Sequence, residues 1–486
     1  MFRLGRCRLR KFLALIFVIF CVSVCILFLV LQSFDEEDFY WDDGAVDFQQ
    51  QFQLSGNADY GGNIIAPDGT DQHTRDHVNV TNIDVRVPII LWWTPFTAER
   101  GKVKACGENK CFFTVDRHFK DHPKTKVFLF YGTDFVPRDL PLPRKKHHEW
   151  ALLHEESPKN NYMLSHEECL TLFNHTSTFK RESDFPLTTQ YLESLSDLTS
   201  TKYLVPTEYK SVSGLAPVVY IHSDCDPPSD RDRYVKELMK YIRVDSYGKC
   251  LHNKDLPVNL VDPLTMHNKG LYKILARYKF NLAFENAICN DYITEKFWRP
   301  LMLGSVPVYR GSPTVRDWLP DNQSAIIADD FPGPKELADY LNYLDSNNEA
   351  YENFLNFKKV GVKNRKLVKT MEDREWGVND YNRPNFIDEF ECFACRRVHE
   401  NLKRASLGVP LKTFQAKKDH YDCPRPRTYN DQKYWSPIEL YLQMYDRDKN
   451  KAKALRKIVL EGRNFSVTEF NELVSRETVG YRDHAL

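Results

Sequence analysis

Short runs of consecutive apolar residues dominate the hydrophobic pattern between residues 87 and 310. They are Val87-Pro-Ile-Ile-Leu-Trp-Trp, Lys126-Val-Phe-Leu-Phe-Tyr, Trp150-Ala-Leu-Leu-His, Pro217-Val-Val-Tyr and Val306-Pro-Val-Tyr. Strands that are buried on both faces of a parallel sheet have this appearance, and turn residues and longer polar segments separate the runs. The pattern predicts an α/β protein with mostly parallel sheets.

One segment, Tyr278 to Trp298, contains both kinds of periodicity. Phe280, Leu282 and Phe284 alternate with other residues, as in a strand. A polar loop follows, and a helix begins near Tyr292-Ile-Thr-Glu-Lys. Open α/β sheets present their ligands where a strand ends and a helix begins. The free N–H groups of that helix start and the charge of Lys296 predict a phosphate-bearing ligand.

Helical periodicity completes two tandem α/β domains. Apolar residues at 234, 235, 238, 241 and 242 predict a helix after the strand at 217, and Val244 begins a further strand, so this part reads as a βαβ unit. We expect one domain at 87–212 and a second at 213–380. The remainder, 381–486, is a less regular extension with an amphipathic helical pattern over 436–474.

The N-terminus carries the one long apolar run. Residues 12–31 are long enough to span a bilayer, basic residues fill the tail 1–11, and acidic residues follow in the polar stem 32–86. Since positive charge stays cytoplasmic, the body should face the lumen of the endoplasmic reticulum or Golgi apparatus as a type II protein. A cleaved signal peptide is the alternative, but its apolar region is usually shorter and ends at small residues.

Cysteines and sequons agree with a lumenal body. Three of the 12 cysteines fall in the tail and anchor, so nine remain and at least one has no partner within the chain. Cys106 and Cys111 are spaced to close a small disulfide ring in a loop, and Cys392-Phe-Ala-Cys395 favours a structural disulfide over a zinc or redox site, with Cys423 a further candidate. Four tripeptides match the N-glycosylation pattern, at Asn79, Asn174, Asn322 and Asn464.

The net charge and the absence of several known sequence motifs argue against several classes of function. The formal net charge is +0, which gives no support to a nucleic-acid partner. Dinucleotide-binding, Walker A, nucleophile-elbow and His-Glu-x-x-His motifs do not occur in the sequence. The triplets Asp224-Cys-Asp and Asp230-Arg-Asp could hold a metal against a diphosphate, but this is a weak pattern in a chain with 67 acidic residues, and we assign no metal ligand.

The remaining chemistry lies on loops. Glu155 and Glu156 follow a strand and either face a cleft or are solvated loop charges. Arg231 begins the helix of the second domain and, with Lys296, could clamp a diphosphate. A carboxylate near them could accept hydrogen bonds from a sugar, and Glu156 could take a proton from an attacking hydroxyl. These residues predict a lumenal two-domain enzyme that uses a nucleotide-linked donor.

At these positions the chain resembles the α-1,3/4-fucosyltransferases of glycosyltransferase family 10. The matching segments are Tyr278-Lys-Phe-Asn-Leu-Ala-Phe-Glu-Asn, Asp291-Tyr-Ile-Thr-Glu-Lys, Val306-Pro-Val-Tyr-Arg-Gly-Ser-Pro and Glu155-Glu-Ser-Pro. The resemblance implies a GT-B fold, in which two Rossmann-like domains face each other across a cleft. It also implies inverting transfer from GDP-fucose with Glu156 as the base. The donor contacts that it implies are Ser223, Arg231, Asn286, Tyr292, Glu295 and Lys296.

The resemblance also bears on the metal requirement, on one donor contact and on the class of acceptor. No metal is required by such a scheme, and Mn²⁺ stimulates some members. Phe179 stands where the family has a tyrosine, so one donor contact is missing. The segments around Phe130, Leu140, His154 and Cys392 are similar to one subgroup, fucosyltransferases 10 and 11, described as protein O-fucosyltransferases of EMI domains. The alternatives are α-1,3-fucosylation of GlcNAc on N-glycans and a non-catalytic lumenal lectin or chaperone.

Overall fold

The computed structural model describes residues 86–96, 101–212, 214–262, 266–429 and 437–483. The predicted tail, the predicted membrane segment 12–31, almost all of the stem and the sequon at Asn79 lie outside these ranges. Among the residues described, no helix combines the length and the apolar character that crossing a membrane requires.

The first unit is built on a six-stranded sheet with the strand order β2-β3-β1-β4-β5-β6. Its strands are β1 (Ile89–Thr94), β2 (Lys102–Cys106), β3 (Asn109–Thr114), β4 (Thr125–Tyr131), β5 (Glu149–His154) and β6 (His175–Thr178). Only the β2–β3 pair is antiparallel. Every side chain of β1 is buried, which explains its continuous apolar sequence. Because β4, β5 and β6 are parallel, their carboxyl ends share one edge.

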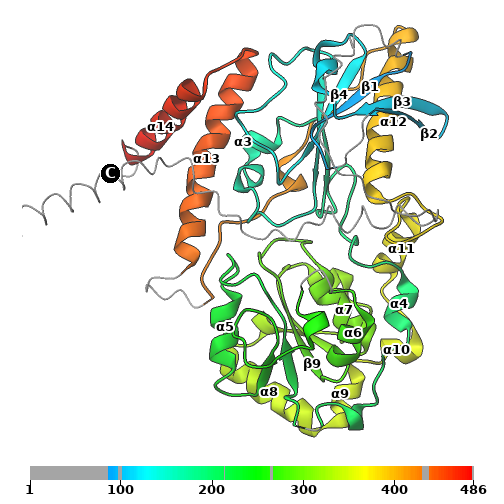
Figure 1. The fold of residues 1–486 in the computed structure, drawn as a ribbon, viewed down its shortest axis with the longest axis vertical. Helices are drawn as coiled ribbons and strands as arrows, with labels where there is room; N and C mark the ends of the chain where they lie inside the picture. The colour runs from blue at the N-terminus through cyan, green and yellow to red at the C-terminus, as the bar shows by residue number, and fades with distance from the viewer. Residues whose placement is uncertain (1–85, 97–100, 213, 263–265, 430–436, 484–486) are drawn as a thin grey trace, which may run out of the picture. The chain divides into compact units, whose positions relative to one another are not determined.

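The second unit contains a five-stranded, fully parallel sheet with the order β11-β10-β9-β7-β8. Its strands are β7 (Val218–Tyr220), β8 (Val244–Ser246), β9 (Phe280–Phe284), β10 (Val306–Arg310) and β11 (Ile326–Ile327). Helices α5 (Arg231–Leu238) and α8 (Pro334–Ser346) pack on each other, as do α6 (Lys269–Leu275) and α7 (Glu295–Leu303). Figure 1 shows the two helix pairs on opposite sides of β9. The predicted α/β class with mostly parallel sheets is therefore confirmed.

The C-terminal part packs on the first unit. Helix α12 (Phe386–Ser406) contacts strands β1 to β4, and α13 (Ile438–Glu461) contacts α3 (Glu167–Leu170), as Figure 1 shows. The remaining helices are α4 (Leu195–Thr199), α9 (Asn348–Asn353), α10 (Phe357–Val360), α11 (Arg365–Asp373) and α14 (Val467–Asp483). Leu455 and Ile458 of α13 are fully buried in the core of the first sheet. The extension thus supplies the outer layers of that unit.

Disulfide bonds connect the extension to the first sheet. All four candidate cysteines form disulfides, but the predicted ring between Cys106 and Cys111 was wrong. Cys106 and Cys111 belong to the β2–β3 hairpin rather than to a loop and do not bond to each other. Cys106 pairs with Cys392, and Cys111 pairs with Cys395. The sequence spacing misled because residues three apart on a helix share a face, so the two cysteines of α12 lie opposite the two strands of the hairpin. The expected unpaired cysteine is the buried Cys169.

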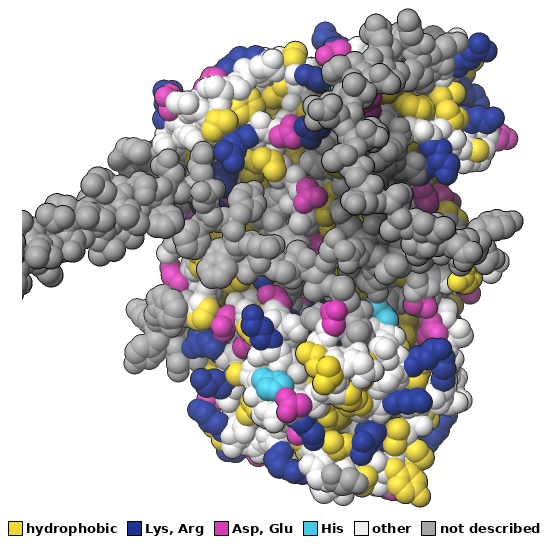
Figure 2. All heavy atoms as spheres, in the orientation of Figure 1, with side chains coloured by type: hydrophobic (Ala, Val, Ile, Leu, Met, Phe, Trp, Pro, Cys, Tyr) yellow, Lys and Arg dark blue, Asp and Glu magenta, His cyan; other side chains and the backbone are white. Residues whose placement is uncertain are grey.

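The surface carries both signs of charge. In the view of Figure 2, Lys and Arg side chains alternate with Asp and Glu side chains over the described part of the face. This mixture agrees with the formal net charge of +0. A surface of this kind has little long-range field for attracting a polyanion.

Candidate active site

The loop after β9 is held by a buried carboxylate. Glu285 is 0% exposed, and its two oxygens accept hydrogen bonds from the backbone N–H and the hydroxyl of Thr294, both at 2.8 Å. Thr294 is the N-cap residue of α7. Glu285 therefore ties the end of the strand to the start of the helix. Burial raises the pKa of Glu285 to about 7, although the charge of Lys296 opposes this.

Lys296 lies at the centre of the charges on this loop. Its Nζ donates to Thr294 Oγ1 at 3.1 Å and to Glu295 Oε1 at 3.0 Å, and it lies 3.8 Å from Glu285 Oε2. Burial disfavours the ionised form of Glu295, but Lys296 and Arg299 outweigh it and lower the pKa of Glu295 to about 2. Glu295 at the start of α7 therefore stays ionised beside Lys296.

The first unit contributes two adjacent carboxyl groups at the end of β5. Glu155 is buried, and its Oε1 accepts a hydrogen bond from the Tyr131 hydroxyl at 3.3 Å. Burial and the charge of Glu156 raise the pKa of Glu155 to about 8, so this group is mostly neutral at pH 7. Burial also raises the pKa of Glu156 above its ordinary value.

His154, the residue before this pair, is also buried but has a different character. Burial lowers the pKa of His154 to about 3, so its imidazole is neutral. A Cβ atom added to Gly132 would lie 2.5 Å from its ring, which shows how closely β4 approaches it. His154 is therefore an uncharged packing group, unlike the two carboxyl groups that follow it.

Charged residues of the second unit change the pKa of Glu156 in the first unit. The charge of Lys296 lowers the pKa of Glu156, and Glu295 and Asp224 raise it, although burial is the larger effect. A direct contact lies nearby, since Lys159 Nζ donates to Asp224 Oδ1 at 2.5 Å. The structure thus brings together Glu156, Glu295 and Lys296, which the sequence separates by about 140 residues.

The other predicted donor residues differ in accessibility. Ser223 is exposed on the loop after β7. Arg231 is 1% exposed, and its guanidinium donates to the carbonyl oxygens of Phe284 at 3.1 Å and Asp224 at 2.6 Å. Buried Arg231 therefore connects the end of β9 to the loop after β7. Asn286 Oδ1 is buried and lacks a hydrogen-bond partner among the described residues, which leaves an acceptor for a ligand.

Tyr292 links this loop to Phe179. Its side chain is buried, and the rings of the two residues lie 5.0 Å apart. Burial and the charges of Glu156 and Glu285 raise the pKa of Tyr292, so its hydroxyl stays protonated. Phe179, where the family has a tyrosine, also packs 5.1 Å from the ring of Tyr421.

Several residues of the site were not predicted. Arg181 bonds to Asp291 through its backbone N–H at 3.2 Å and its Nε at 2.7 Å, and its guanidinium lies 4.9 Å from the ring of Trp318. Tyr421 donates a hydrogen bond to the carbonyl oxygen of Glu156 at 2.9 Å. Arg181 lies two residues after Phe179, inside the segment Phe179-Lys-Arg-Glu-Ser-Asp that resembles the family, and could have been noticed, whereas nothing local marks Tyr421.

Three of the four carboxylates of the two Asp-x-Asp triplets, those of Asp224, Asp230 and Asp232, bond to protein groups. Asp232 accepts hydrogen bonds from the Tyr220 hydroxyl and from Asp226 N. Asp230 accepts from Tyr429 N at 3.2 Å. These carboxylates shape the loop before α5.

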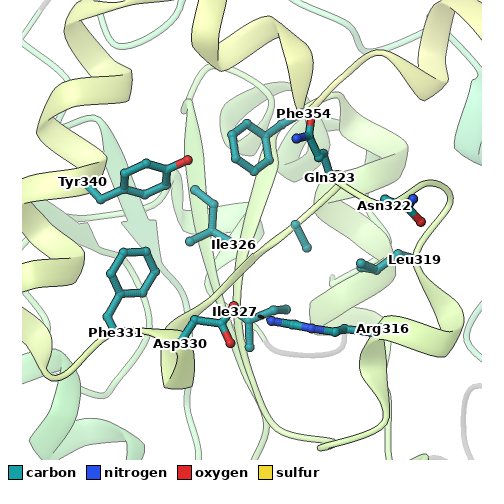
Figure 3. A pocket seen from close by; sticks show the side chains of 11 residues that line it. Arg316, Leu319, Asn322, Gln323, Ile326, Ile327, Asp330, Phe331, Tyr340 and Phe354 are labelled. Carbon is teal, nitrogen blue, oxygen red and sulfur yellow. Dashed lines mark hydrogen bonds and ion pairs between the residues drawn. The ribbon is translucent and has the colours of Figure 1, made fainter.

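Two cavities lie outside this group of residues. One, of about 450 Å³, lies beside β11 and is lined by Phe331, Tyr340 and Phe354, with the predicted glycosylation residue Asn322 among the labelled lining residues (Figure 3). The other, of about 630 Å³, is lined by Asn174, by basic side chains at 144–146 and by apolar side chains of α12 and α13. Neither cavity is lined by the predicted catalytic or donor residues.

The sequons differ in exposure. Asn322 and Asn464 are exposed. Asn174 is partly buried, its Nδ2 donates to the carbonyl oxygen of Phe414 at 2.8 Å, and its Oδ1 accepts from Trp150 N at 2.8 Å. Whether any of the three carries a glycan stays a prediction.

The fold and the site define a class of protein: an α/β enzyme of two sheets, in which a carboxylate from one unit lies near an ionised Glu–Lys pair from the other. Comparison with known proteins gives the family. The model "Fucosyltransferase, N-terminal" matches residues 85–191, and "Glycosyltransferase family 10 (fucosyltransferase) C-term" matches residues 214–412. The chain belongs to glycosyltransferase family 10, the fucosyltransferases.

Individual relatives are similar over most of their length. GDP-fucose protein O-fucosyltransferase 3 of Rattus norvegicus is 53% identical over 401 residues, covering 80% of this chain and 83% of the relative. The protein of the same name from Homo sapiens is 52% identical over 398 residues, with the same coverage. A crystal structure of an alpha1,3-fucosyltransferase with GDP-fucose aligns with a TM-score of 0.37 at 16% identity, covering 65% of this chain and 90% of that chain.

Proposed function

We propose that this chain transfers L-fucose from GDP-fucose to the hydroxyl of Ser or Thr in folded secretory protein domains of the EMI type. The observation that carries the proposal is the electrostatic coupling of Glu156 to Lys296 and Glu295, because it sets a proton acceptor beside a diphosphate-binding cation. The relatives named GDP-fucose protein O-fucosyltransferase 3 support both the donor and a protein acceptor.

The reaction is an inverting displacement. Ionised Glu156 takes the proton of the acceptor hydroxyl while the hydroxyl oxygen attacks C1 of fucose from the face opposite GDP. The bond between C1 and the β-phosphate oxygen breaks, and GDP leaves with the electron pair. Lys296 offsets the negative charge that develops on the diphosphate, and buried Arg231 adds positive charge beneath the same loops.

The donor lies in a cleft between the two units, in the GT-B manner. Ser223, Asn286, Tyr292 and Glu295 supply hydroxyl, amide and carboxylate groups for the sugar and nucleotide. Asn286 Oδ1, which has no hydrogen-bond partner within the described part of the chain, supports this assignment. Since Lys296 and Arg231 provide positive charge, we propose that transfer needs no divalent metal. A chelator should leave the rate within about twofold, and loss of activity restored by Mn²⁺ would contradict this part of the proposal.

The compartment follows from the covalent structure. Four disulfides lie within the described body, and such bonds persist in oxidising compartments. We propose that the body works in the lumen of the endoplasmic reticulum or Golgi apparatus, attached to the membrane by residues 12–31. Protease protection of intact microsomes tests this, and cleavage of the body without detergent would contradict it.

The direct test is mass spectrometry of acceptors after incubation with GDP-fucose. An EMI-domain protein should gain one deoxyhexose on Ser or Thr, and a protein carrying only N-glycans should gain none. Gain on the GlcNAc of an N-glycan would instead establish α-1,3-fucosylation. Preference for a UDP-linked donor would end the fucose assignment, and no binding of GDP-fucose at millimolar concentration would indicate a lectin or chaperone.

A further inference from the structure

The segment 416–423 lies along the edge strand of the first sheet, next to the base. Ala416 N donates to the carbonyl oxygen of Phe173 at 2.9 Å, and the Thr178 hydroxyl donates to the carbonyl oxygen of His420 at 2.6 Å. The His420 ring also shares a 2.7 Å hydrogen bond with Thr176. The family match ends at residue 412, so this segment lies outside what the family model describes.

Tyr421 is the residue of this segment that reaches the base. It is 0% exposed, and its hydroxyl donates to the Glu156 carbonyl oxygen at 2.9 Å. Its ring lies 5.0 Å from that of His154 and 5.1 Å from that of Phe179, which in turn lies 5.0 Å from Tyr292 of the donor loop. A line of packed rings thus runs from the end of β5 to the donor loop.

A covalent bond fixes the same segment to the donor loop. Cys423, two residues after Tyr421, forms a disulfide with Cys289. Cys289 lies between Asn286 and Tyr292, both predicted donor residues, and the backbone N–H of Tyr292 donates to its carbonyl oxygen at 3.2 Å. One short segment therefore holds the base from one side and the donor loop from the other.

We propose that Tyr421 is a positioning residue for Glu156, and that the Cys289–Cys423 disulfide sets its register against the donor loop. A hydrogen bond to the backbone carbonyl restrains the peptide from which the Glu156 side chain projects, and a base must be held close to the proton that it takes. Burial and the charges of Glu156 and Glu155 raise the pKa of Tyr421, so the hydroxyl remains a donor. The inference rests on the proposed role of Glu156.

A matched pair of substitutions tests the role of the hydroxyl. Tyr421→Phe removes only the oxygen and should lower kcat about 3- to 10-fold, the range for loss of one hydrogen bond. The affinity for GDP-fucose, measured by calorimetry, and the KM for donor should stay within about twofold. Tyr351→Phe is the control, because Tyr351 is also 0% exposed and its hydroxyl also donates to a backbone carbonyl, that of Lys279, at 2.9 Å.

The two variants should lose similar thermal stability but differ in kcat. An equal fall of kcat in both variants, an unchanged kcat in Tyr421→Phe, or a rise of KM alone would overturn the inference. A wild-type chain that does not turn over GDP-fucose with the EMI-domain acceptor would instead contradict the proposed function, so the two failures can be told apart.

Removal of the disulfide provides an independent test. The double variant Cys289→Ser/Cys423→Ser should lower kcat at least as far as Tyr421→Phe, and adding Tyr421→Phe to it should cost little more, because the two changes release the same segment. Cys106→Ser/Cys392→Ser removes a disulfide of the β2–β3 hairpin and should leave kcat within about twofold. If the effects of Tyr421→Phe and of the Cys289→Ser/Cys423→Ser double variant on kcat were fully additive, the proposed coupling between them would be wrong.

Discussion

Both units bring carboxyl groups to the candidate site, but the pair at the end of β5 and Glu295 at the start of α7 are in opposite states. At the end of β5, loss of solvation raises the pKa values of the buried Glu155 and the half-buried Glu156, and the charge of Glu156 also acts on Glu155. At the start of α7, Lys296 and Arg299 overcome the effect of burial and lower the pKa of Glu295 to about 2. Glu155 is therefore mostly neutral at pH 7 and the pKa of Glu156 is raised, whereas Glu295 stays ionised.

The difference shows how similar residues acquire different roles. A carboxyl group without its own cation suits proton transfer, because its pKa lies closer to the working pH. A carboxylate bound to a lysine suits the fixing of that lysine beside an anion. The assignment of Glu156 as base and of Lys296 as the diphosphate partner depends on this contrast, and four substitutions test it.

The largest effect is expected from Glu156→Gln. The amide keeps the shape of the side chain but cannot accept the proton, so kcat should fall roughly 10²- to 10⁴-fold, the range for general-base catalysis. GDP-fucose should still bind, as measured by calorimetry. Turnover equal to that of the wild type would show that another group is the base.

Lys296→Met should lower kcat roughly 10²- to 10³-fold, because the charge that offsets the leaving diphosphate is lost. Since Lys296 lowers the pKa of Glu156, the acid limb of the pH–rate profile should move to higher pH. The exposed Lys335, which pairs with Asp339, offers the control Lys335→Met. An acid limb at the same pH as in the wild type would show that the charge of Lys296 does not act on Glu156.

Glu285→Gln should change the pH dependence of stability. The folded pKa of Glu285, about 7, lies above its ordinary value of 4.5. Its contribution is therefore fully present below about pH 4.5 and is lost as the pH rises through 7. The stability of the wild type relative to Glu285→Gln should fall between pH 4.5 and 8 by an amount on the order of 3 kcal/mol. Urea unfolding at several pH values measures this, and parallel curves would contradict it.

Glu295→Gln should have the smallest effect and the opposite sign to Lys296→Met. Glu295 raises the pKa of Glu156, so its removal should move the acid limb of the pH–rate profile to lower pH. The two profiles, recorded with one acceptor at one ionic strength, should lie on either side of the wild-type profile. Shifts in the same direction would mean that the variants act through the fold rather than through charge.

Much of the scaffold was predictable because buried parallel strands are apolar throughout. The runs at Ile89, Val127, Trp150, Val218 and Val306 all became strands. The polar residues between a strand end and a helix start, such as Asn286 and Lys296, also lie where the pattern placed them, since a strand–loop–helix is a local structure.

Contacts between distant segments could not be predicted. Arg181 and Asp291 are 110 positions apart, and Tyr421 lies 265 positions from Glu156. The burial that raises the pKa of Glu155 likewise depends on neighbours that no local pattern reveals. The disulfide partners follow from the packing of α12 on the hairpin, so the spacing of Cys106 and Cys111 alone gave the wrong ring.

The Cys106–Cys392 bond makes the second unit part of a covalent ring. The bond joins positions 286 residues apart, and the strands β7 to β11 all lie between them. A single cut of the backbone between these strands therefore leaves two pieces that remain attached through sulfur. Fragments of a nicked chain should migrate together on a non-reducing gel and separate only after reduction. The ring also limits the distance between the two units when the second unit unfolds. This lowers the entropic cost of bringing them back together on refolding.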